Sequence, residues 1–90
     1  MKSKQNSEDD ITLTALFIEA LELPDDTPKQ DLLNLRRGLD AQWDSIRHVF
    51  LLNQIEKRFN IRFDVADAVN IRSFADTTTA VAKKLASSEN

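Results

Sequence analysis

Residues 43–59 read WDSIRHVFLLNQIEKRF, and this stretch holds the most regular helical pattern in the chain. At about 100° per residue, its apolar side chains recur on one side of a helix. The side chains expected to face the core are Val49, Leu52, Ile55 and Phe59, with Leu51 at the margin of that arc. The pattern therefore predicts a central helix over residues 45–59 whose inward arc anchors the fold.

The start of this helix combines a carboxylate with a hydroxyl. Asp44 is of a residue type favoured at the helix N-cap, where it is typically worth ~1 kcal/mol more than alanine. Ser45 falls in the first turn, where backbone N–H groups lack helical partners and the helix dipole favours negative charge. A phosphate ester on the Ser45 hydroxyl would be stabilised there. The simpler interpretation is that Ser45 is only a capping residue.

Asp44-Ser45, followed by apolar residues at helical spacing, resembles the start of the modified helix in the acyl carrier protein family. The residues that carry the resemblance further are Ile46, Val49, Leu51, Leu52, Ile55, Glu56 and Phe59. The resemblance spans roughly residues 11–86 and implies that Ser45 carries 4′-phosphopantetheine beside Asp44. Ile46 departs from the leucine usual in the family, and Trp43 and His48 resemble a specialised subgroup of free-standing carriers.

The resemblance also implies a function. The chain would hold acyl groups as thioesters and deliver them to biosynthetic enzymes, without being an enzyme itself. Its expected partners are a phosphopantetheinyl transferase and the enzymes that load and transfer the acyl group, and the chain is expected to be a monomer. One alternative is a helical interaction module of the same fold that carries no prosthetic group.

A second alternative is a small hydrolase in which Ser45 and His48 act together. These residues are three apart and can meet on a helix, but no orienting third group or strand-turn-helix elbow is evident. A partly buried packing role is therefore expected for His48. It is the only histidine, which excludes a histidine-based metal cluster, and no acidic spacing matches a calcium loop.

The other side of the central helix has an unusual composition for the resembled family, in which this surface is typically acidic. The residues predicted to bind partners are Ile46, Arg47, Phe50, Asn53 and Lys57, with Gln54 and Arg58 beside them. Apolar anchors ringed by positive charge predict a partner surface that is less basic and more apolar than general fatty-acid enzymes present. The alternative is that Phe50 turns inward against the long loop.

The remaining pattern predicts an all-α, acyl-carrier-like bundle with three main helices and one short helix. A first helix is expected over 11–22, a short one over 65–69, and a last one that begins at Ser73, with Ser73 and Asp76 resembling a capping box. The apolar residues expected to face inward from the first and last helices are Leu13, Leu16, Phe17, Ala20 and Leu21, and Phe74, Thr78, Val81 and Leu85.

The segments between the helices give further expectations. In the long connection 24–42, some of the leucines should fold back onto the core, with a short helical turn as one way to do so; they are Leu32, Leu33, Leu35 and Leu39. Ile61 and Phe63 should plug the core, and Trp43 should be partly buried. Arg36 and Arg37 are expected to be a solvated pair, or alternatively to contact an anion near Ser45.

Composition limits the function classes. The hydrophobic fraction of 41% and charged fraction of 30% are ordinary for a globular domain, and a net charge of −3 does not suggest nucleic-acid binding. With no cysteine, any thiol must arrive with a prosthetic group. No apolar run approaches the ~20 residues of a membrane span, and no signal peptide is evident, so a cytoplasmic location is expected.

The expected organisation is a disordered N-terminal tail over 1–9, an acyl carrier domain over 10–86 and a frayed C-terminus over 87–90.

Overall fold

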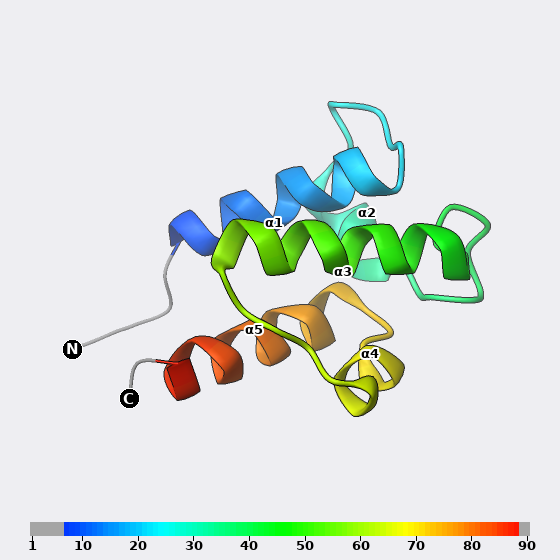
Figure 1. The fold of residues 1–90 in the computed structure, drawn as a ribbon. Coiled ribbons are helices and arrows are strands. Elements are labelled where there is room, and N and C mark those ends of the chain that lie inside the picture. Colours follow the sequence, from blue (N-terminus) through cyan, green and yellow to red (C-terminus); the bar gives the residue numbers. More distant parts are fainter. Residues whose placement is uncertain (1–6, 89–90) are drawn as a thin grey trace.

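The structure, a computed structural model, describes residues 7–88. Its regular elements are all helices, joined by loops (Figure 1). The elements are α1 (Ser7–Ala20), α2 (Lys29–Asn34), α3 (Ser45–Phe59), α4 (Val65–Asn70) and α5 (Phe74–Ser88). Within residues 7–88 no strand forms, which confirms the prediction of a small all-α bundle. Three helices are long, as predicted. Two helices are short where one was expected, because part of the long connection 24–42 forms α2.

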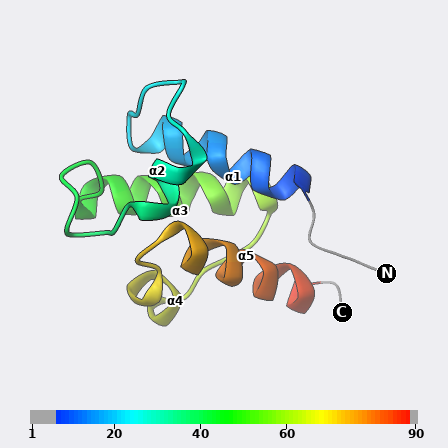
Figure 2. The same ribbon diagram turned by 180° about the vertical axis from the view of Figure 1, so that it is seen from behind.

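The three long helices form the body of the bundle. α1 packs along α3 and runs in the opposite direction, while α5 lies on the other side of α3, as both ribbon views show (Figures 1 and 2). α2 packs against α1 and α5, and α4 lies near the end of the bundle where α3 begins. The start of α3 therefore lies at the opposite end of the bundle from the start of α1 and the end of α5 (Figure 1).

An aromatic cluster joins the helices at the centre of the core. The Phe17 ring of α1 stands edge-on to Trp43, with 5.2 Å between ring centroids, and 4.9 Å from the ring of Phe74 on α5. Trp43 is completely buried, whereas only partial burial was expected. Its indole is covered because it fills the space beside Phe17 and because its N–H has a partner inside the protein, which removes the usual need for solvent.

α3 has the predicted boundaries but a rotated inward face. The buried residues are His48, Leu51, Leu52 and Ile55, with Phe59 partly buried. The expectation for Val49 was wrong, since 58% of it is exposed, and Leu51 is fully buried, not marginal. Because His48 occupies an inward position, Val49, about 100° further round the helix, turns outward.

The predicted apolar face of α1 is confirmed, and that of α5 is confirmed in part. Leu13, Phe17, Ala20 and Leu21 are buried and Leu16 packs beside them. On α5, Phe74 and Val81 are buried and Leu85 packs against the core, but Thr78 is only partly buried and Thr77 is the fully buried threonine. α1 begins at Ser7, inside the segment 1–9 expected to be a tail, and its first turn carries three acidic residues that suit the positive end of a helix. Residues 1–6 and 89–90 lie outside the described residues, and α5 extends to Ser88, into the segment expected to fray.

The connections follow the predictions in part. Leu32 is fully buried and Leu35 partly so, while Leu33 and Leu39 remain exposed. Ile61 is buried and Phe63 partly buried, as expected. Half of the predicted capping box forms, because the Ser73 hydroxyl accepts from the Asp76 N–H at 3.1 Å, whereas the Asp76 carboxylate accepts from the Arg72 N–H.

Among residues 7–88, none of the helices has the length and apolar character needed to cross a membrane.

Candidate functional site

Asp44, not Ser45, caps α3. The Asp44 backbone is extended (φ −86°, ψ 179°) and its Oδ1 accepts a hydrogen bond from the Arg47 N–H at 2.8 Å. Ser45 is the first helical residue, is exposed, and its hydroxyl makes no hydrogen bond to any residue within 7–88. Ser73 offers a contrast, because its hydroxyl is used in the cap of α5. The interpretation of Ser45 as a capping residue is therefore wrong, and its hydroxyl is available.

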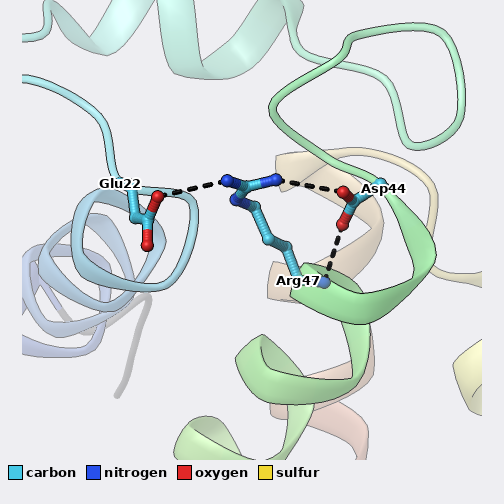
Figure 3. Close-up of polar contacts among 3 residues, drawn as sticks. All are labelled: Glu22, Asp44 and Arg47. Carbon is cyan, nitrogen blue, oxygen red and sulfur yellow. Dashed lines mark hydrogen bonds and ion pairs between the residues drawn. The ribbon is translucent and has the colours of Figure 1, made fainter.

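Arg47 bridges the end of α1 and the start of α3 (Figure 3). One guanidinium nitrogen lies 3.0 Å from Asp44 Oδ2 and another lies 3.1 Å from Glu22 Oε1. The pKa of Arg47 is raised, first by the hydrogen bond to Glu22 and next by the charge of Asp44. Glu22 follows α1 in the left-handed region, with φ of 58°. A cation is thus held beside Asp44, at the positive end of α3.

A buried hydrogen-bond chain fixes the residues on either side of Ser45. The indole Nε1–H of Trp43 donates to His48 Nδ1 at 3.0 Å, and His48 Nε2 lies 2.9 Å from the Ala68 carbonyl oxygen on α4. Because Nδ1 accepts, Nε2 carries the proton and donates to Ala68. Burial lowers the pKa of His48, more than its hydrogen bond to Ala68 raises it, and nearby Arg37 lowers it further. His48 is therefore a neutral residue whose two ring nitrogens both have partners.

This arrangement does not provide a base for Ser45. A serine nucleophile needs a ring nitrogen that can accept its proton, and the accepting nitrogen of His48 is taken by Trp43. The His48 side chain is buried in the core, whereas Ser45 is exposed. The structure brings the two residues onto one helix but does not pair them, which argues against the hydrolase hypothesis.

The loop before α3 is anchored by Arg37. Its Nε donates to the Ile71 carbonyl at 2.9 Å and its Nη2 to the Val69 carbonyl at 2.7 Å, both at the end of α4. Cations are favoured there, because the last carbonyl groups of a helix lack helical partners. Arg36 donates to the carbonyls of Leu33, in the last turn of α2, and Leu35, which follows that helix. The expectation of a solvated arginine pair holds for Arg36, which is exposed, and was wrong for Arg37, which is partly buried and anchored to the end of α4.

The predicted partner-binding residues divide into two groups. Ile46, Phe50, Asn53 and Lys57 are all exposed along α3, and the alternative in which Phe50 turns inward is excluded by its 45% exposure. Arg47 differs, because its guanidinium is engaged by Asp44 and Glu22. Arg58, which flanks the set, is exposed, and Gln54 is partly buried.

Sequence reasoning missed the contacts that hold this end of the molecule together. They join Trp43 to His48, His48 to α4, Arg37 to the end of α4, and Arg47 to Glu22. The five-residue spacing of Trp43 and His48 is a weak signal that an indole donor has an acceptor nearby. Across residues 7–88, no group of three or more histidine, cysteine or acidic side chains is placed to hold a metal ion.

Comparison of the chain with protein-family models, with curated proteins and with solved structures finds no match.

Proposed function

We propose that the chain is a carrier protein of the acyl carrier type, to which a phosphopantetheinyl transferase attaches 4′-phosphopantetheine through the Ser45 hydroxyl. The observation that carries the proposal is the exposed, unbonded hydroxyl of Ser45 at the first position of a 15-residue helix. Asp44 performs the capping, so Ser45 can be modified without loss of a hydrogen bond that stabilises the fold.

The residues at the start of α3 fit a phosphate ester. Ser45 and Ile46 lie in the first turn, where backbone N–H groups have no helical acceptor and an anion is favoured. The Arg47 guanidinium, close by at Asp44, adds positive charge. When bound, the prosthetic group supplies the thiol that this cysteine-free chain lacks, and acyl groups are held on it as thioesters.

The surroundings of Ser45 support a role as a platform for other enzymes. In the loop before Ser45, a hydrogen bond fixes Trp43 to His48 of α3, and another fixes Arg37 to the Val69 carbonyl of α4. Ile46 and Phe50, just after it, are exposed and leave room for an enzyme to approach. The chain would present acyl intermediates to biosynthetic enzymes, and the chemical steps would take place in their active sites.

Intact-mass measurement tests this proposal. Incubation with a broad-specificity phosphopantetheinyl transferase and coenzyme A should add one phosphopantetheine to the wild-type chain. Ser45→Ala should abolish the addition, and Ser73→Ala is the matched control, because Ser73 also stands at the start of a long helix but uses its hydroxyl in a cap. Addition that survives Ser45→Ala would contradict the assignment of Ser45. A folded wild-type chain that is never modified would favour the interaction module.

A further inference from the structure

Five residues of α3 form an exposed surface, called the α3 outer face: Ile46, Val49, Phe50, Asn53 and Lys57. Ile46 is 80% exposed, Val49 58% and Phe50 45%, so three large apolar side chains stand together on one helix without cover. Isolated apolar residues on a surface are ordinary, but a contiguous group marks a site of interaction.

Positive charge lies at one end of this face. A hollow of about 510 Å³ continues from Phe50 and Asn53 to Lys57 and Arg62. Within residues 7–88, the ion pairs involve Lys29, Arg47 and Lys84, and none involves Lys57 or Arg62. The acid in the lining, Glu56, accepts a hydrogen bond from the Phe63 N–H at 2.8 Å, so its carboxylate is directed to the protein's own backbone.

We propose that the α3 outer face binds an amphipathic helix of a partner protein, with an apolar stripe on Ile46, Val49 and Phe50 and carboxylates paired with Lys57 and Arg62. An apolar row next to cations is complementary to an apolar row next to acids, and such complementarity sets partner choice and association rate. The face lies on a 15-residue helix, about 22 Å long, which accommodates about four turns of a partner.

A protein partner fits these charges better than an anionic membrane does. Electrostatic membrane binding uses clusters of about four to eight basic residues. The hollow offers two, Lys57 and Arg62, beside the carboxylate of Glu56, and the chain as a whole carries a net charge of −3. Two cations at a defined place suit pairing with two carboxylates on one helix.

Two synthetic helical peptides, each about five turns long, provide the probes. They share one leucine stripe, and the flanking positions are glutamate in the first peptide and lysine in the second. Titration of the isotope-labelled full chain, followed by amide chemical shifts, should show the glutamate peptide binding at least tenfold more tightly. The shifts should map to Ile46, Phe50, Asn53 and Lys57, and the affinity should fall as salt is raised.

Charge reversal identifies the cations responsible. Lys57→Glu with Arg62→Glu should reverse the preference between the peptides, whereas Lys83→Glu on α5, also an exposed lysine, should leave it unchanged. Phe50→Ala should weaken the binding of both peptides, because it removes an apolar contact that they share. The proposal would be overturned by equal affinity for the two peptides, by tighter binding of the lysine peptide, or by chemical-shift changes that map to another surface. It would also be overturned if anionic phosphatidylglycerol vesicles bound this face and neither peptide did.

The inference does not depend on the modification of Ser45. Ser45→Ala should bind the glutamate peptide as the wild-type chain does, and the mass of each sample reports on the prosthetic group separately. Failure of the peptide preference would therefore leave the proposed carrier function standing, and failure of modification would leave this surface standing.

Discussion

Replacing His48 with leucine removes the acceptor of a fully buried indole N–H while keeping the space largely filled. The unsatisfied donor on Trp43 should cost about 1–3 kcal/mol. The second lost bond, to the Ala68 carbonyl, should cost less, because Ala68 is partly exposed and water can replace the ring. His48→Leu should therefore lower the free energy of unfolding by about 1.5–3.5 kcal/mol. That is a large share of the roughly 5–13 kcal/mol of total stability expected for a chain of 90 residues.

The stability that His48→Leu loses relative to wild type should be smaller at low pH. The pKa of His48 is lower in the folded chain than in the unfolded one, because burial disfavours its charged form. Between the unfolded value near 6.5 and the lower native value, the unfolded state binds more protons, so wild-type stability falls as pH falls. The slope from this group is at most ~1.4 kcal/mol per pH unit. His48→Leu lacks this term, so its stability deficit should shrink between pH 7.5 and pH 5.

Urea denaturation at pH 7.5, 6 and 5 measures both effects, and the single histidine of the chain makes the assignment direct. In a Trp43→Phe background the donor is already absent, so His48→Leu should cost less by about 0.5–3 kcal/mol. A deficit that stays constant from pH 7.5 to pH 5, or one of equal size in the Trp43→Phe background, would refute the hydrogen-bond chain as the source of stability.

Two further predictions concern the core and the backbone. Leu52→Ala and Ile55→Ala should each lower the free energy of unfolding in urea by about 2–5 kcal/mol, because both side chains are buried. Val49→Ala should lower it by less than about 1 kcal/mol, because Val49 is exposed. Equal losses for the three variants would show that the inward face of α3 is misassigned. In thermal unfolding, Glu22→Gly should be more stable than Glu22→Ala by about 1 kcal/mol. Both variants lose the exposed ion pair with Arg47, but only glycine adopts a φ of 58° without strain. A more stable alanine variant would contradict this prediction.

The boundaries of α3 could be predicted because local chemistry sets them. Asp44 caps the first turn, and Asn60, in the left-handed region with φ of 57°, ends the helix. The start of α1 also had a local signal, since acids in the first turn suit the helix dipole, but Glu8 and Asp9 were assigned to the disordered tail over 1–9. A run of charge is ambiguous between these two outcomes.

The local pattern correctly placed Leu52 and Ile55 on the inward face of α3, but it did not predict the rotation of that face toward His48 or the anchoring of the loop. His48 is polar by type and buried only because Trp43 and Ala68 satisfy both ring nitrogens, which periodicity does not encode. Arg37 binds carbonyl groups more than 30 residues along the chain, and Arg47 reaches Glu22 25 residues back. Such contacts depend on how the helices pack, so they become visible only once the fold is known.

The separation of roles between Asp44 and Ser45 makes position 45 suitable for site-specific chemistry. Because Asp44 supplies the cap, the residue at position 45 can be exchanged with little effect on the helix. Ser45→Cys would introduce the only thiol in a cysteine-free chain, exposed at the first residue of a rigid helix. A fluorophore or spin label attached there would report distances from one end of the bundle, with the short stretch from Trp43 to His48 holding its base in place.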